Sequence, residues 1–358
     1  MRSSIDMLPL SQASYGLLIE ALLAWYDDHR RDLPWRAGPG MASDSYHVLV
    51  SELMLQQTTV ATVRRRFAPF IQRFPTLSAL AAASEADVLH AWQGLGYYRR
   101  ARALHACARK VVETHGSILP DDTDRLMTLP GLGAYTAKAV AAIAFNQPVV
   151  PVDGNVMRVL SRLFQIETPL PKAAKELHKL AAQFEPVDRP ADTAQALMDL
   201  GATVCRPKAP ECDRCPWNTV CVARASGTAS NLPNRTPKHQ RPLRQGVAFL
   251  LARSDGAVLF RRRPTEGLLG GLHELPSSQW RPAPIDREAA LNEAPAKVDW
   301  RFHRNKVRHV FTHFALELDL AEAIFDGPLD GLWQPADAFD RLALPSVMKK
   351  LLREAGRL

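Results

Sequence analysis

Two carboxyl side chains stand where acid–base chemistry on a substrate is expected. Glu52 lies in the segment Ser51-Glu52-Leu53-Met54-Leu55, and its helical neighbours are mostly apolar: Val48, Leu49, Leu55 and Gln56. Burial among them would raise the pKa of Glu52 and keep a proton available. Asp153 opens an apolar helical segment, where the helix dipole holds a capping carboxylate ionised. Such a pair supplies an acid and an anion, although singly each would be an ordinary solvent-reaching glutamate or helix cap.

Four of the five cysteines form a C-x6-C-x2-C-x5-C pattern. They are Cys205, Cys212, Cys215 and Cys221. Four thiolates in so short a loop can hold a tetrahedral zinc ion or a [4Fe–4S] cluster. The spacing leaves both open, although only one pair has the short separation of a zinc knuckle.

A glycine-rich turn joins two helical patterns at Leu129-Pro130-Gly131-Leu132-Gly133. Glycines at positions 131 and 133 allow a tight turn whose backbone N–H groups face outward at the start of the next helix. Such groups bind phosphate without reading sequence. This turn predicts a contact with a phosphate backbone through Gly131 and Gly133.

These residues need a largely helical scaffold, which apolar periodicity predicts up to about residue 224. The expected helices cover residues 46–63, 77–92, 99–113, 134–145, 156–164 and 193–204. A basic linker rich in Ser, Pro and Asn follows at 225–244. Residues 245–358 are predicted to be an α+β domain. Its expected strands are 246–252, 257–262 and 306–320, and its expected helix is 346–354. The first two strands are expected to form a hairpin with the turn Ser254-Asp255-Gly256 between them.

Length and charge agree with two domains and a polyanionic partner. The chain has 358 residues and a formal net charge of +8, and Lys and Arg in excess favour nucleic acid. Neither a signal peptide nor an apolar run of membrane-spanning length is seen, so a cytoplasmic protein without a membrane partner is expected. No interface signal stands out, and we expect a monomer.

The motifs together resemble the MutY family of adenine DNA glycosylases, within the helix-hairpin-helix superfamily of endonuclease III. The matching segments are L-P-G-L-G-x-x-T-A, V-D-G-N-V, S-E-L-M-L-Q-Q-T and the cysteine spacing directly after Met198–Ala202. The resemblance implies a helix-hairpin-helix at 126–145 and a [4Fe–4S] cluster on Cys205, Cys212, Cys215 and Cys221. It also implies a base flipped from DNA, protonated at N7 by Glu52 while Asp153 stabilises the sugar cation. Tyr135 and Asn155 would line the sugar side.

Further DNA contacts follow from the same resemblance. Gln57 and Tyr97 match wedge residues that fill the space left in the base stack, and Leu95 is expected to contact DNA in the same segment as Tyr97. Arg36 is a weaker candidate for the pocket and for DNA. Residues 267–276 resemble the region before a Nudix box, but the R-E-x-x-E-E metal helix is absent. The resemblance therefore implies a MutT-like module that recognises 8-oxoguanine through Phe311, Thr312 and His313, with Thr312 where the family has serine. The expected partner is double-stranded DNA with adenine opposite 8-oxoguanine or guanine, which would put the protein on the nucleoid.

Three other functions compete with the adenine glycosylase. An endonuclease III-like lyase needs a lysine where this chain has Tyr135, which cannot form a Schiff base; Lys138 lies almost one helical turn further on, and Met157 replaces a lysine of some relatives. A second alternative is a non-catalytic iron–sulfur DNA-binding protein. A nucleotide diphosphohydrolase is the third, and the missing Nudix helix counts against it.

Overall fold

The computed structural model describes residues 11–358 except 39, 186–187, 237–240, 265 and 283. It divides into two compact units, which are described separately: Met1–Ala83 with Ala103–Pro237, and Ser84–Arg102 with Lys238–Leu358. The second unit thus includes a stretch, 84–102, that lies in the interior of the predicted helical region. In the described part of the chain, no helix combines the length and the apolar character that crossing a membrane requires.

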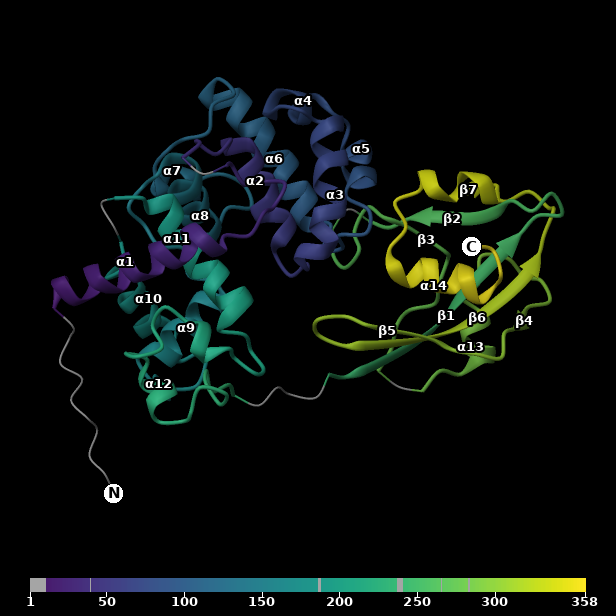
Figure 1. Ribbon diagram of the computed structural model, residues 1–358. Coiled ribbons are helices and arrows are strands. Elements are labelled where there is room, and N and C mark those ends of the chain that lie inside the picture. Colours follow the sequence, from purple (N-terminus) through teal and green to yellow (C-terminus); the bar gives the residue numbers. More distant parts are fainter. Residues whose placement is uncertain (1–10, 39, 186–187, 237–240, 265, 283) are drawn as a thin grey trace. The chain divides into compact units, whose positions relative to one another are not determined.

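The first unit is helical, as predicted (Figure 1). Its elements in chain order are α1 (Gln12–His29), α2 (Ser45–Leu55), α3 (Val60–Arg73), α4 (Leu77–Ala82), most of α6 (Arg99–His115), α7 (Thr123–Met127), α8 (Ala134–Phe145), α9 (Gly154–Leu163), α10 (Ala174–Ala182), α11 (Pro190–Asp199), the π-helix η1 (Leu200–Val204), the short 3-10 helix η2 (Cys212–Arg214) and α12 (Val222–Ala225). Helix α8 is apolar nearly all round, so it forms the centre and packs against α2, α7 and α11.

The predicted single helix at 46–63 is wrong, because the chain forms α2 and α3 there with a break between them. Gln57 adopts a left-handed backbone with φ of 56°, which ends the first helix. Thr59 then caps α3 by accepting the N–H of Thr62. The predicted single helix at 77–92 is also wrong, because the chain forms two helices there. After α4 has ended, Ser84 caps a second helix, α5 (Glu85–Ala91).

The predicted helix-hairpin-helix is present as α7, a turn and α8. Gly131 has φ of 82°, and a Cβ there would lie 2.5 Å from the Cβ of Ala103, so only glycine fits. Gly133 is the N-cap of α8, and a Cβ on it would meet no atom within 4 Å. The first glycine is required by the fold, whereas the second leaves open space at a helix N-terminus.

Besides α5 and the start of α6, the described part of the second unit contains a mixed sheet, the helices α13 (Arg287–Leu291) and α14 (Ser346–Glu354) and the 3-10 helix η3 (Ala336–Arg341), which confirms the α+β prediction. The strands run in the order β3-β2-β1-β6-β4, with β5 on β6 and β7 on β2. They are β1 (Leu243–Ala252), β2 (Val258–Arg262), β3 (His273–Glu274), β4 (Arg301–Phe302), β5 (Val307–Val310), β6 (Ala315–Ile324) and β7 (Leu332–Gln334). The predicted hairpin is confirmed, because β1 and β2 pair antiparallel. A single strand at 306–320 is wrong: β5 and β6 are antiparallel neighbours joined by a turn.

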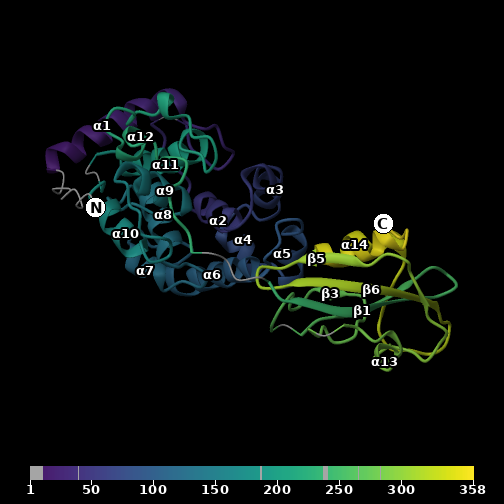
Figure 2. The same ribbon diagram turned by 90° about the horizontal axis from the view of Figure 1, so that it is seen from below.

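Helices cover both faces of this sheet, so its central strands are buried on both sides. Figure 2 shows α14 (Ser346–Glu354) and α13 (Arg287–Leu291) on opposite faces. Alternate residues of β1 belong to two separate apolar clusters: Ala248 and Leu250 pack with α14, while Val247 and Phe249 pack with α13. The sheet therefore gives a rigid base for the β5–β6 turn.

Candidate active site

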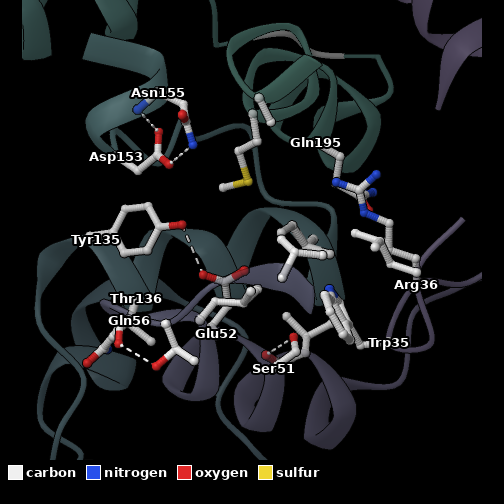
Figure 3. Close-up of a pocket in the computed structure, with 18 of the residues that line it drawn as sticks. Trp35, Arg36, Ser51, Glu52, Gln56, Tyr135, Thr136, Asp153, Asn155 and Gln195 are labelled. Atoms are coloured by element: carbon white, nitrogen blue, oxygen red, sulfur yellow. Dashed lines mark hydrogen bonds between the residues drawn. The ribbon is translucent and has the colours of Figure 1, made fainter. Parts of the chain in front are cut away.

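A cavity of about 700 Å³ in the first unit gathers most of the predicted catalytic residues (Figure 3). It lies where α2, the start of α8, the start of α9 and the end of α11 meet. Glu52, Tyr135, Asp153 and Asn155 all line it. The sequence did not single out further lining residues that the structure adds: Trp35, Ser51, Gln56, Thr136, Gln195 and Met198.

Glu52 projects from α2 into this cavity and is only 6% exposed. Burial is the main influence and raises the pKa of Glu52 to about 7. A hydrogen bond from Tyr135 opposes the rise, the negative charge of Asp153 adds to it, and the guanidinium of Arg36 opposes it. The expected burial and raised pKa of this carboxyl are therefore confirmed, and near neutral pH it holds a transferable proton.

Tyr135 lies in the first turn of α8, and its hydroxyl donates to Glu52 Oε2 at 3.0 Å. Burial raises the pKa of Tyr135 well above its ordinary value, and the two neighbouring carboxyls add to this effect, so the phenol stays a donor. In Figure 3 its ring lies between Glu52 and Asp153. The next residue, Thr136, accepts a hydrogen bond from Gln56 Nε2 at 3.0 Å, which ties α8 to the end of α2.

Asp153 caps α9, as predicted, and is held by three donors. Its Oδ1 accepts the backbone N–H groups of Asn155 at 2.8 Å and Val156 at 2.7 Å. The side-chain amide of Asn155 donates to Oδ2 at 2.8 Å. These three donors hold the Asp153 carboxylate in one orientation at the N-terminus of α9, beside the cavity.

Asn155 is itself fixed by the segment that leads into the cysteine loop. Arg158, which is buried, donates to Asn155 Oδ1 at 2.8 Å, to Gly201 O at 2.6 Å and to Cys205 O at 2.8 Å. A Cβ on Gly201 would lie 2.7 Å from the Cβ of Asn155, so α9 and η1 are in close contact. The orientation of Asp153 therefore depends on residues more than forty positions later in the chain.

Arg36 lines the cavity, but its guanidinium is already paired. Its two terminal nitrogens donate to the carboxylate of Asp199 at 2.6 and 2.7 Å, and Arg31 donates to the same group. Burial works to raise the pKa of Asp199, but the hydrogen bonds and charge of Arg36 outweigh it and hold this pKa below its ordinary value. This buried ion pair forms one wall of the cavity, and the pairing of Arg36 with Asp199 was not predicted from the sequence.

The two predicted wedge residues share a strained backbone. Gln57 borders the cavity with φ of 56°, and Tyr97, in the second unit, has φ of 47° and is 50% exposed. Left-handed residues with a Cβ are uncommon and often mark functional positions. The side chain of Leu95 is only 4% exposed and packs into the protein, so the predicted DNA contact at this position is one for its backbone.

The segment Phe311–Phe314 is the turn between β5 and β6 in the second unit. Phe311 N–H donates to Phe314 O at 2.8 Å, and the Phe311 ring stacks on Trp280 with centroids 6.0 Å apart. Thr312, at the tip, forms a hydrogen bond with the Tyr97 hydroxyl at 3.2 Å, and its carbonyl accepts Arg241 Nε at 3.1 Å. Thr312 and His313 are exposed, so their side chains are open to a ligand.

The four predicted cysteine ligands line one small cavity of about 30 Å³ in the first unit. Its other walls include Arg162 and the apolar side chains of Val204, Pro210 and Ala229. Four soft sulfur donors with a cation beside them fit an iron–sulfur cluster by the chemistry of the donor set. Within the described residues, no three His, Cys, Asp or Glu side chains are arranged to hold a single metal ion.

Known proteins resemble this chain in both units. The family model described as HhH-GPD superfamily base excision DNA repair protein matches residues 50–184, and a NUDIX domain model matches 247–354. The adenine DNA glycosylase of Homo sapiens is 36% identical over 93% of this chain and 73% of its own length. The one from Mycolicibacterium smegmatis is 44% identical over 64% of this chain and 78% of its own length. A thermostable thymine-DNA glycosylase structure covers 60% of this chain and 98% of its own at 28% identity, with a TM-score of 0.54.

A helix-hairpin-helix beside a cavity with one buried carboxyl of raised pKa and one carboxylate that caps a helix defines a base-excision DNA glycosylase of the helix-hairpin-helix superfamily. The chain belongs more narrowly to the adenine DNA glycosylase family, the MutY family, with a C-terminal Nudix-like domain. It is thus a base-excision repair enzyme that acts on the N-glycosyl bond of adenine.

Proposed function

We propose that this enzyme is a monofunctional glycosylase that hydrolyses adenine from duplex DNA where the base is mispaired with 8-oxoguanine or guanine. The observation that carries the chemistry is the pair of unlike carboxyls on one cavity: Glu52 with a pKa raised to about 7, and Asp153 held by three donors. Such a pair supplies a general acid and a fixed anion, the combination that cleavage of a glycosidic bond requires.

In the proposed reaction the adenine is flipped out of the duplex into the cavity. Glu52 donates its proton to N7, which makes the base a better leaving group, and Tyr135 keeps the carboxyl oriented. As the bond from C1′ to nitrogen breaks, its electron pair leaves with the base and the sugar becomes an oxocarbenium ion. Asp153 stabilises this cation, by an ion pair or a covalent sugar adduct, and a water molecule completes the abasic site.

The cavity favours hydrolysis over lyase chemistry. A lyase forms a Schiff base between an amine and C1′. None of the described residues that line this cavity is a lysine. Tyr135 stands in the place of the lyase lysine, while Lys138 does not line the cavity and lies 3.9 Å from the Glu185 carboxylate, in an ion pair. We therefore infer no nicking of the strand without alkali.

We propose that the protein binds DNA through several separate contacts. The open space at Gly133, at the N-terminus of α8, suits a phosphate oxygen that accepts backbone N–H groups. The strained residues Gln57 and Tyr97 are proposed to enter the base stack, and the exposed Thr312 and His313, with Phe311 behind them, are proposed to contact 8-oxoguanine. The basic net charge supports binding to DNA, and we propose that the protein acts as a monomer on nucleoid DNA in the cytoplasm.

A [4Fe–4S] cluster is proposed on Cys205, Cys212, Cys215 and Cys221. When bound, it would supply structural cross-linking of the loop rather than a step in bond cleavage. A chain of hydrogen bonds connects the loop to the active site. Arg158 donates to the Cys205 carbonyl and to the Asn155 side chain, and Asn155 donates to Asp153, which orients this carboxylate. Iron and zinc analysis with the visible absorption spectrum distinguishes the cluster from a zinc site.

The test of the function uses purified protein and three duplexes that carry adenine opposite 8-oxoguanine, guanine or thymine. Alkali then reveals abasic sites. We expect cleavage of the first two, little of the third, and none in a Glu52→Gln variant. Cleavage before alkali would favour the lyase alternative, and tight binding of the mispair without any base release would favour a non-catalytic DNA-binding protein.

A further inference from the structure

The guanidinium of Arg162 is a buried positive charge beside the cysteine cavity. Arg162 lies near the end of α9, the helix that Asp153 caps, and it is only 1% exposed. It is among the largest fully buried side chains of the described residues. A cation so far from water is costly unless a negative charge lies close to it.

Every acceptor of this guanidinium belongs to the cysteine loop or to the segment that follows it. Nη1 donates to Arg206 O at 2.8 Å and lies 3.2 Å from Cys205 Sγ. Nε donates to Leu232 O at 3.0 Å, and Nη2 donates to Pro207 O at 3.3 Å. Three of these acceptors are neutral carbonyls, and the fourth is a cysteine sulfur.

No carboxylate in the described part of the chain lies within ion-pair distance of Arg162. Other arginines in or next to the cysteine loop differ: Arg206 and Arg214 each pair with Glu211 at 2.7 Å, and Arg224 pairs with Asp213 at 2.9 Å. Those three are partly exposed, so water also screens them. Among the described residues that line the cavity, Arg162 is therefore the buried cation without a carboxylate partner.

The four cysteines that line the cavity with Arg162 can supply the missing charge. As thiols they are neutral, but as ligands of an iron–sulfur cluster they are thiolates, and a cluster with four thiolates is negative overall. The positive charge of Arg162 on α9 and the negative charge of a cluster bound by the cysteine loop would therefore be of opposite sign and in contact, since Arg162 Nη1 lies 3.2 Å from Cys205 Sγ.

We propose that Arg162 is the counter-ion of the cluster, and that its positive charge, rather than its shape, sets how firmly the cluster is retained and how readily it is oxidised. This role rests on the proposed cluster. A nearby cation stabilises the more negative, reduced state, so loss of the charge lowers the reduction potential and favours loss of an electron to an oxidant such as ferricyanide. Arg162 is a positioning residue and takes no part in bond cleavage.

The experiment compares Arg162→Gln with Arg162→Lys, which keeps the charge, in the full-length iron-loaded protein. Arg224→Gln is the matched control, since Arg224 lines the same cavity but is exposed and paired with Asp213. The measurements are iron per chain, the reduction potential by voltammetry, and the rate at which ferricyanide bleaches the visible absorbance.

We expect ferricyanide to bleach Arg162→Gln about tenfold faster than the wild type, because this is the size of effect that loss of one charge-assisted hydrogen bond produces. The reduction potential of this variant should be lower than that of the wild type. Arg162→Lys and Arg224→Gln should both stay close to the wild type. Failure of the Gln variant to load iron while the Lys variant loads it would also support a charge role.

Two results would overturn the proposal: wild-type potential and bleaching in Arg162→Gln, or equal failure of the Gln and Lys variants to load. A wild-type protein that contains zinc or no metal would instead refute the cluster itself, and the metal analysis of the unmutated protein distinguishes that case at once.

Discussion

Glu52→Gln should make this enzyme more stable at alkaline pH while abolishing its activity. The ordinary pKa of a glutamate is 4.5, and in the fold burial raises that of Glu52 to about 7. At 1.36 kcal/mol per pH unit, the difference corresponds to about 3 kcal/mol. Because the folded pKa is the higher one, the folded state keeps its full stability below pH 4.5 and loses that amount as the pH rises through 7.

Glutamine has the same shape but never ionises, so the variant escapes this loss. Its side-chain oxygen can still accept the Tyr135 hydroxyl, which keeps the local packing. Relative to the wild type, we expect its free energy of unfolding to rise by about 2–3 kcal/mol between pH 5 and pH 8. Urea denaturation followed by helical circular dichroism at both pH values measures the change.

The matched control is Glu113→Gln on α6, whose side chain is 74% exposed and should show no such dependence. A stability difference between Glu52→Gln and the wild type that is the same at pH 5 and pH 8 would refute the reasoning, as would a variant less stable than the wild type at pH 8. A difference that is the same at both pH values would mean that Glu52 ionises as easily in the fold as in water, and its role as the acid would then lose its physical basis.

Four other substitutions test the acid, the turn and the recognition loop. Tyr135→Phe removes the hydrogen bond that stabilises the ionised form of Glu52, so the pKa of Glu52 should rise. The pH midpoint above which single-turnover cleavage declines should therefore move up from about 7 by roughly one to two pH units. An unchanged or lower midpoint contradicts this. Gly131→Ala should lower the free energy of unfolding by about 1–3 kcal/mol, because Gly131 has a positive φ and a close neighbour. Gly133→Ala should keep the wild-type melting temperature and weaken DNA binding. An equal loss of melting temperature in both variants would contradict this difference between the two glycines. Arg241→Gln removes the donor to the Thr312 carbonyl and should reduce the preference for 8-oxoguanine over guanine about fivefold, with adenine–guanine cleavage unchanged; an unchanged preference in the two duplex assays would exclude this role.

Local features of this protein could be predicted from its sequence because they depend on near neighbours in the chain. The Asp153 cap, the glycine turn at Gly131, the β1–β2 hairpin and the cysteine spacing all follow from backbone geometry over a few residues. The breaks inside the predicted helices were missed because apolar periodicity continued across them. Gln57, which has no intrinsic preference for a left-handed backbone, ends α2 only in the packed protein.

Tertiary structure alone decided the electrostatics of the site. The pKa of Glu52 depends on burial and on Tyr135, which lies 83 positions later in the chain. The role of Arg36 as a wall of the cavity depends on Asp199, which is 163 positions away. Charge–charge and desolvation effects act through space, so the sequence determined which groups could carry charge, and only the packing of distant helices decided which of them are protonated, paired or left without a carboxylate partner.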